Sequence, residues 1–311
     1  MMSSTVLSHL FIGTIVLIAS STTQANPEIT GANSKIMFDD FSYKTLSEAQ
    51  KNGWVPRTQV GHPGIKNATW WSEGISFHPD QEDGNNTVMR LTSKTDGSPE
   101  NTRHTQICHQ RKYLEGTYAA RVYFNDQPDF GPDGDGIVET FYTISPLEAP
   151  MDKNYSEMDF EYLANGGWGE KENVLFSTSW ETFQLEPWTK INAFDSYVKS
   201  LQGWNTVVLQ VFDSEIKYYI NGHLFSTHGG EVYPEVAMSL NFNLWFIPEQ
   251  IVESSQMRQY HQEVDWVYFN ADKNLSHNEV LKEVVTLRTQ KIKQQDTVPH
   301  WLPKLDSYCG L

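Results

Sequence analysis

Short runs of β-branched and aromatic residues, separated by turn-forming residues, occupy the chain between residues 36 and 270. Gly116 to Asn125 is one such run, and Gly136 to Ser145 is another, which follows the turn-forming cluster FGPDGDG. Ala237 to Phe246 and Glu263 to Phe269 continue the series. Many short strands separated by turns are typical of two packed sheets, so we predict an all-β sandwich.

The clearest local prediction is a hairpin on either side of residue 214. Trp204 to Phe212 and Glu215 to Ile220 are both strand-like, and only the dipeptide Asp213-Ser214 separates them. The dipeptide Asn221-Gly222 follows at once and is the strongest short turn signal in the chain. We therefore expect consecutive antiparallel strands here.

The pattern changes from strand-like to helical after Asn270. Apolar residues recur at helical spacing between Ser276 and Lys291, at Val280, Leu281, Val284, Val285 and Leu287. Ser276 and Glu279 resemble a capping box, which marks a helix start. We predict an amphipathic helix lying on the sandwich, followed by an extended tail, and treat residues 271–311 as a C-terminal helical extension.

The N-terminus has the features of a secretory signal peptide. Leu7 to Ala19 is almost entirely apolar and too short to span a bilayer, and Thr23-Gln24-Ala25 ends in the small residue that a cleavage site needs. We expect residues 1–25 to be removed on export to the extracellular space or periplasm, leaving no membrane attachment. An uncleaved anchor is the alternative.

Two cysteines, Cys108 and Cys309, remain in the exported chain. In an oxidising compartment they could pair and hold the C-terminus to the body of the protein. Their wide separation leaves two free thiols as an alternative.

The charge balance argues against nucleic acid as a partner. The chain has 39 acidic and 23 basic residues, a formal charge of −16, and no patch rich in Lys or Arg that could bind phosphates. An acidic surface would also repel a sulfated or uronic polymer, which favours a neutral one. Aromatic residues make up 13% of the chain, and flat rings suit the apolar faces of sugars as well as they suit cores.

The segment Ser156 to Leu163 carries the candidate chemistry. On a strand, Glu157, Asp159 and Glu161 would share one face, and the apolar residues between them would share the other. Three neighbouring carboxylates repel one another, although an exposed strand face could tolerate them. Four residues of strand span about 13 Å, and two Glu side chains leaning together can reach the ~5–5.5 Å separation of retaining glycosidases. The middle acid would stay protonated or share a proton.

The five residues EMDFE, Glu157 to Glu161, resemble the ExDxE signature of glycoside hydrolase family 16 in its regular form, without the bulge. Further segments resemble the family's pattern in the same order: Gly116 to Arg121, Gly136 to Tyr142, Trp204 to Phe225, the NLW triplet Asn243 to Trp245, and Val264 to Tyr268. Ala119 departs from the pattern, since members often have Glu there. The region beyond Asn270 matches nothing in it.

The resemblance implies a catalytic domain over residues 26–270, folded as a β-jelly-roll of two antiparallel sheets with a concave glycan cleft. By the family's pattern Glu157 is the nucleophile, Asp159 its assistant and Glu161 the general acid/base. Candidate stacking platforms for sugar rings are Trp245, Trp168, Trp180 and Tyr142. Arg121 and Asn243 would bind sugar hydroxyls or the nucleophile, or else serve as structural partners. Asp265 resembles a residue that ligates a structural calcium in some members, and no cofactor is required.

These observations lead us to expect a secreted, monomeric, retaining endo-glycosidase that hydrolyses neutral β-linked glucan, with β-1,3-1,4 or related linkages. Two alternatives stay open. One is a transglycosylase acting on xyloglucan or cell-wall glucan, in which a sugar replaces water as the acceptor. The other is a non-catalytic glycan-binding module, against which the intact row of carboxylates argues.

Overall fold

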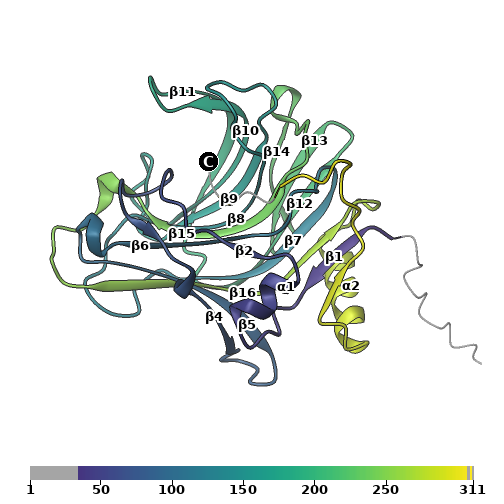
Figure 1. The fold of residues 1–311 in the computed structure, drawn as a ribbon, viewed down its shortest axis with the longest axis horizontal. Coiled ribbons are helices and arrows are strands. Elements are labelled where there is room, and N and C mark those ends of the chain that lie inside the picture. The colour runs from purple at the N-terminus through teal and green to yellow at the C-terminus, as the bar shows by residue number, and fades with distance from the viewer. Residues whose placement is uncertain (1–33, 307–308, 310–311) are drawn as a thin grey trace, which may run out of the picture. The chain divides into compact units, whose positions relative to one another are not determined.

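The structure is a computed structural model that describes residues 34–306 and 309. The expected signal peptide, residues 1–25, lies outside the described residues. Within them, antiparallel strands form two layers, here called the site sheet and the back sheet (Figure 1). No helix in this part of the chain is both long and apolar enough to cross a bilayer.

The site sheet contains the strand with the three acids near its middle. In spatial order its strands are β2 (Val55–Pro56), β6 (Arg103–Cys108), β15 (Ser239–Phe246), β8 (Ile137–Ile144), β9 (Glu157–Leu163), β10 (Val174–Gln184) and β11 (Thr189–Val198). Figure 1 shows this sheet curving, with β11 rising at its free edge. Its outer face is therefore concave.

The back sheet is built around the longest strand, β16. Its order is β14 (His223–Gly229), β13 (Glu215–Ile220), β12 (Gly203–Phe212), β7 (Gly116–Phe124) and β16 (Arg258–Asn270). One half of β16 then pairs with β5 (Thr87–Thr95), which pairs with β4 (Ile75–Pro79), and the other half pairs with β1 (Ile36–Asp39), which pairs with β17 (Gln294–Asp296). The predicted hairpins through residues 213–214 and 221–222 are confirmed.

The two sheets are joined at one edge. A single ladder pair, Lys94 with Arg103, connects β5 to β6, and β3 (Thr69–Trp70) runs parallel to β6 beside it. The remaining elements are short: helix α1 (Leu46–Lys51) and the 3₁₀ turns η1 (Ser72–Gly74), η2 (Pro99–Asn101), η3 (Gly230–Val232) and η4 (Pro248–Gln250). The predicted sandwich of two antiparallel sheets is confirmed, with this one link between them.

The core lies between the sheets and fixes which way β9 faces. Phe160 of β9 packs edge-on against Tyr218 of β13, with ring centroids 5.1 Å apart. Phe242 of β15 and Val122 of β7 belong to the same buried cluster. Burying a side chain of this size is worth roughly 1.5–3 kcal/mol, so the alternation along β9 places its acidic residues on the opposite, concave face.

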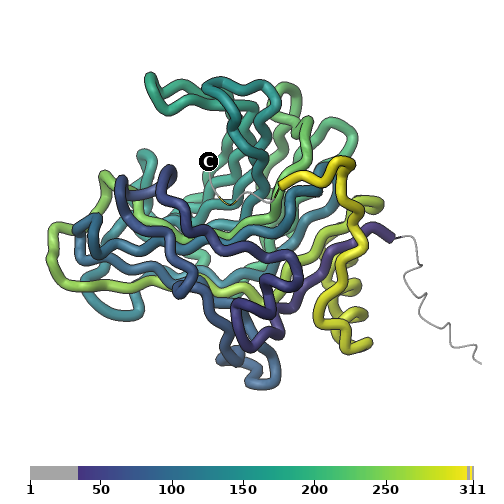
Figure 2. The backbone as a smooth tube through the Cα atoms, in the orientation of Figure 1, coloured from purple at the N-terminus to yellow at the C-terminus, as the bar shows by residue number. Residues whose placement is uncertain are grey.

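The predicted C-terminal helix is present as α2 (His277–Thr289) and lies on the outer face of the back sheet. Its capping box between Ser276 and Glu279 is formed, with hydrogen bonds in both directions. Val280, Val284 and Leu287 pack with residues of β1, β7, β12 and β16. Figure 2 shows the yellow C-terminal segment beside the purple β1, so the extension is packed against the sandwich.

Cys108 and Cys309 form a disulfide with their Cα atoms 5.6 Å apart, so the pairing that the sequence left open is present. A second tie lies close by in the chain, where the buried Nζ of Lys112 donates to both oxygens of Asp296 at 2.7 Å and to the carbonyl of Val298 at 2.9 Å. Together they hold the C-terminal segment to β6 and to the segment between β6 and β7.

Replacing both cysteines with Ser should lower the free energy of unfolding by about 2–5 kcal/mol, because the disulfide closes a loop across most of the chain. Urea denaturation followed by tryptophan fluorescence measures this loss. Dithiothreitol should bring the wild type to the midpoint of the double variant and leave the double variant unchanged. Equal midpoints for the oxidised wild type and the double variant would contradict a stabilising role.

Candidate active site

The concave face of the site sheet holds a cleft of about 530 Å³. Its floor comes from β15, β8, β9 and β10, and one wall is the hairpin of β10 and β11. The segment after β2, the turn after β9 and η4 complete the lining. Segments that are distant in the sequence thus meet around β9.

The three acids of β9 line this cleft in a row, as predicted. Met158, Phe160 and Tyr162 alternate with them and lie in the core. Asp159 is buried, whereas Glu157 and Glu161 are half-buried and so reach the cleft. The strand therefore separates an apolar inner face from an acidic outer face.

Strand registers place a defined partner beside each acid. Glu157 stands level with Ile144 of β8 and Trp180 of β10. Asp159 stands level with Tyr142 and Thr178, and Glu161 with Thr140 and Phe176, on the same two strands. Because directly paired residues share a face in an antiparallel sheet, these side chains form rows across the cleft.

Aromatic clusters flank the carboxylates on both sides. Beside Glu161, the Trp168 ring lies 5.4 Å from Phe176 and 6.2 Å from Trp245, between ring centroids. Beside Glu157, the Trp180 ring lies 5.7 Å from Phe183 and 6.4 Å from Trp188. Of these rings, Trp168 and Trp188 are exposed and Trp180 is half-buried, and the other three are buried. Exposed rings at a cleft offer apolar faces on which sugar rings stack.

Hydrogen bonds tie the row of acids to its surroundings. The indole nitrogen of Trp180 donates to Asp159 at 2.8 Å, and the hydroxyl of Tyr155 donates to Glu157. Asp159 and Glu157 are hydrogen-bonded to each other. The Thr178 hydroxyl donates to Glu161 at 3.5 Å, a long contact.

Burial raises the pKa of all three acids above that of ordinary carboxyls. Burial raises the pKa of Glu157 to about 7, against the opposing effect of the hydrogen bonds from Tyr155 and Asp159. Burial and the charge of Glu157 raise the pKa of Glu161 to about 8. Burial, then the charges of Glu157 and Glu161, raise the pKa of Asp159 well above its usual range. Asp159 therefore keeps its proton at neutral pH, and Glu161, with a pKa of about 8, is also largely protonated there.

Most of the other predicted site residues reach the cleft. Trp245, Tyr142, Trp168, Trp180 and Asn243 all line it. Trp180 also orients Asp159, a role that the sequence did not suggest. The side-chain oxygen of Asn243 accepts a hydrogen bond from the Thr140 hydroxyl at 2.6 Å, so a neighbouring strand fixes its orientation.

Arg121 is not in the cleft, which corrects the prediction that it binds sugar. It lies on β7 of the back sheet, where its neighbours Ala120 and Val122 fill the core and its own side chain points to the outer face. Its guanidinium donates to Asp265 at 2.8 Å and lies over the ring of Trp204, 4.4 Å from the centroid. It is a structural residue of the convex side.

Asp265 does not fit a calcium site. Its carboxylate accepts hydrogen bonds from Arg288 at 2.5 Å, from Arg121 at 2.8 Å and from Asn86 at 2.7 Å. Two guanidinium groups at one carboxylate would repel a cation and already occupy its oxygens. Across the described residues, no group of three or more His, Cys, Asp or Glu side chains is placed to hold a metal ion.

Two segments of the cleft were missed from the sequence. One is β11, which contributes Lys190, Asn192 and Phe194 from alternate positions. This alternation is the sequence feature that could have identified these three residues as cleft residues. The other is the segment after β2, in which Arg57 lies over the ring of Trp70, 4.0 Å from its centroid, and donates to Gln106 at 3.1 Å. Arg57 lies far from β9 in sequence, so only the fold brings it to the site.

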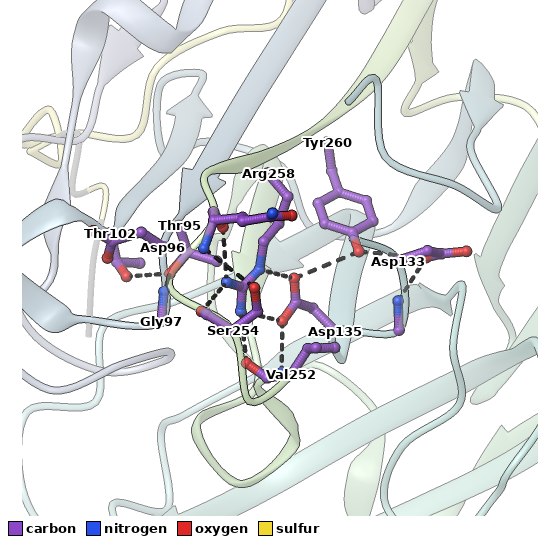
Figure 3. A network of polar contacts seen from close by, with 12 residues as sticks. Thr95, Asp96, Gly97, Thr102, Asp133, Asp135, Val252, Ser254, Arg258 and Tyr260 are labelled. Carbon is purple, nitrogen blue, oxygen red and sulfur yellow. Dashed lines mark hydrogen bonds and ion pairs between the residues drawn. The ribbon is translucent and has the colours of Figure 1, made fainter. Parts of the chain in front are cut away.

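The loop between β7 and β8 contains a buried ion pair of Asp135 with Arg258, which Figure 3 shows. Arg258 donates to both oxygens of Asp135, at 2.7 and 2.8 Å, inside the predicted FGPDGDG turn cluster. The side chain of Asn165, just after β9, donates to Asp133 at 3.1 Å and to the carbonyl of Asp135 at 3.0 Å. The loop between β7 and β8 therefore holds the turn after the acidic strand.

No family model and no curated protein sequence matches this chain. Its fold, however, matches many solved structures. A Bacillus licheniformis beta-glucanase aligns with a TM-score of 0.52 and 16% identity over 78% of this chain and 99% of that one. The chain therefore has the same fold as this glucanase.

Other solved structures extend this comparison. A glycoside hydrolase family 16 endo-glucanase from Bacteroides ovatus aligns with a TM-score of 0.57 and 15% identity over 75% of this chain and 98% of its own. A laminarinase from Flavobacterium sp. UMI-01 gives 0.51 and 14%, over 75% and 98%. Such low identities show the fold alone, so the case for function depends on the cleft.

Replacing Glu161 with Gln should stabilise the fold at alkaline pH, because an amide carries no charge to bury. The pKa of Glu161 lies at about 8, above the ordinary 4.5, so the folded protein binds this proton more tightly than the unfolded chain does. The cost of the ionised carboxyl is absent below pH 4.5 and grows until pH 8.

Thermal unfolding at pH 4 and pH 8 measures the effect. The Glu161→Gln variant should match the wild type at pH 4 and unfold about 5 °C higher at pH 8. Glu172→Gln, an exposed residue before β10, is the control and should show no such dependence on pH. A Glu161→Gln gain that is the same at both pH values would contradict the burial cost.

Proposed function

We propose that this protein is a retaining endo-glycosidase that hydrolyses neutral β-linked glucan. In this proposal Glu157 is the nucleophile, Glu161 the general acid/base and Asp159 the residue that orients Glu157. The observation that carries the proposal is the row of three acids on β9, set in a cleft with aromatic rings on both sides. A surface strand with no chemistry to perform would gain nothing from raising the pKa of all three.

The reaction proceeds in two displacements. First, an oxygen of Glu157 bonds to the anomeric carbon, the bond from that carbon to the leaving oxygen breaks, and Glu161 gives its proton to that oxygen. Then Glu161 takes a proton from water, the water oxygen bonds to the same carbon, and Glu157 leaves as a carboxylate. Each step inverts the carbon, so the product retains the β configuration.

The ionisation states required by this mechanism coexist near neutral pH. Glu157 must be ionised to attack, and its pKa is about 7, whereas Glu161 must be protonated to donate, and its pKa is about 8. Asp159 keeps its proton and can donate it in a hydrogen bond to the Glu157 carboxylate. Activity should therefore be highest between about pH 7 and 8.

A neutral β-glucan is the substrate that the cleft favours. Three carboxyls and a protein charge of −16 disfavour a sulfated or uronic chain. The exposed rings of Trp168 and Trp188 and the half-buried ring of Trp180 offer stacking surfaces on either side of the point of cleavage, whereas Trp245 is buried behind Trp168. The similar folds of proteins described as a beta-glucanase and a laminarinase support the same substrate class.

Export from the cell also belongs to the proposal. The disulfide between Cys108 and Cys309 fits an oxidising compartment, and the apolar N-terminal segment fits a signal peptide. We propose that the mature protein is a monomer that acts outside the cytoplasm on an extended polysaccharide.

Variants of the two glutamates test both the function and the assignment of roles. Wild-type protein should release reducing ends from mixed-linkage glucan or laminarin, and Glu157→Ala should lower kcat by at least 10⁴-fold, since the covalent step is lost. With an activated β-glycoside and azide, Glu157→Ala should form the α-glycosyl azide, by one displacement. Glu161→Ala should form the β-glycosyl azide, by two.

Product configuration is read by NMR. The reverse pairing of azides would exchange the roles of Glu157 and Glu161. If the wild type binds glucans but cleaves none, the protein is a glycan-binding module and not an enzyme. Transfer to added sugar in place of water would indicate the transglycosylase.

A further inference from the structure

Tyr155 is a buried residue that none of the roles assigned above explains. It lies two positions before Glu157, and its side chain is 1% exposed. Its hydroxyl donates to Oε2 of Glu157, while its ring is not part of the lining of the cleft. Tyr155 therefore contacts the candidate nucleophile without lining the cleft in which a substrate would bind.

The backbone around Tyr155 is held from several directions. Its amide donates to the carbonyl of Asp152 at 3.3 Å. The next residue, Ser156, exchanges two hydrogen bonds of 2.9 Å with Ser145, one through each residue's backbone amide. These hydrogen bonds fix the backbone that carries the Tyr155 side chain.

The ring itself is held by apolar packing. It meets Phe183 edge-on, with centroids 5.4 Å apart and an angle of 79° between the planes. Tyr142 and Ile144 of β8 complete the same buried cluster. A tyrosine fixed in this way gives up little conformational freedom when it holds a hydrogen bond.

The hydroxyl has a clear electrostatic effect on Glu157. Burial raises the pKa of Glu157 to about 7, and the hydrogen bond from Tyr155 acts in the opposite direction, ahead of the one from Asp159. Burial and the charge of Glu157 raise the pKa of Tyr155 well above its usual range, so its hydroxyl remains a donor at every working pH. A donor to an ionised acceptor stabilises the ionised form.

We propose that Tyr155 is a positioning residue that holds Glu157 in its ionised, attacking orientation. This inference rests on the proposed function. In the first displacement the Glu157 carboxylate becomes an ester and loses its charge. In the second it leaves as a carboxylate again, and the Tyr155 hydroxyl stabilises the returning charge at Oε2 without giving up its proton.

Other charged and titratable groups around Glu157 must stay constant for a test of this idea. They are Asp159 and Glu161 on β9, Tyr142 on β8, Tyr218 on β13, Lys190 on β11, Arg57 and His62 after β2, and Glu249 in η4. Replacing Tyr155 with Phe changes none of them and keeps the ring. Any change in the ionisation of Glu157 then reports on the lost hydroxyl.

The test measures the rate at which a 2-deoxy-2-fluoro β-glucoside with a good leaving group inactivates the enzyme, as a function of pH. Intact mass spectrometry follows the glycosyl adduct on Glu157, so the readout is the first displacement alone. In the wild type the acidic limb should lie near pH 7, the pKa of Glu157. In Tyr155→Phe it should move up by about one pH unit, with a maximal rate about tenfold lower, because a hydrogen bond to a charged group is lost.

Tyr162→Phe is the matched control. Tyr162 is on β9, the strand that carries Glu157, and is as buried as Tyr155. Its hydroxyl also donates to a carboxylate, that of Asp126, but on the opposite face. The acidic limb of the pH profile of Tyr162→Phe should lie at the same pH as that of the wild type. If Tyr155→Phe does not fold, site-specific 3-fluorotyrosine at position 155 retains a hydroxyl that is a stronger donor, and the limb should move to lower pH.

The outcomes distinguish a failure of the proposed function from a failure of the role of Tyr155. A wild type that forms no adduct and cleaves no glucan contradicts the proposed function. A wild type that forms the adduct, with a Tyr155→Phe limb at the wild-type pH, overturns the role of Tyr155 and leaves the proposed function standing. An equal shift in Tyr162→Phe would also overturn it, since a general loss of packing would then explain the effect.

Discussion

The site depends on one constraint, which is that three carboxyls must share one face of a single strand. Alternation along β9 places Met158, Phe160 and Tyr162 in the core, so Glu157, Asp159 and Glu161 have no other face to occupy. Three charges at this spacing would repel one another strongly at low dielectric. The structure meets the constraint by keeping a proton on Asp159 and by donating to the row from Trp180, Tyr155 and Thr178.

The rest of the fold positions this strand and shapes the space above it. β8 and β10 bring a defined side chain level with each acid, and the hairpin of β10 and β11 raises a wall of aromatic and polar residues. The pair of Asp135 and Arg258 supports the turn after β9, and the disulfide anchors the C-terminal segment to β6. Breaking a buried pair leaves an uncompensated charge, which is why such supports tolerate little change. A rigid frame of this kind suits a reaction that needs atoms placed within a fraction of an ångström.

Local patterns in the sequence were sufficient to predict local structure. The acidic face of β9, the hairpin at residues 213–214 and the capped helix α2 all follow from spacing, and the structure confirms each of them. Arg121 was misplaced because alternation tells which residues share a face of a strand, but not which of two sheets the strand joins. Asp265 was misread for a different reason: the resemblance suggested a calcium ligand, but two arginines from distant segments, on β7 and α2, donate to its carboxylate. Arg57 and the disulfide depend on contacts across long separations, which the sequence alone does not set.

In the proposed mechanism Glu157 and Glu161 act together by two displacements at one carbon. The most direct measurement is the configuration of the newly formed reducing end, followed by proton NMR in the first minutes of hydrolysis, before the anomers equilibrate. With two displacements the β-anomer should appear first, and the α-anomer should form only by mutarotation. Initial formation of the α-anomer would mean a single displacement by water and would contradict the assignment of Glu157 as the nucleophile.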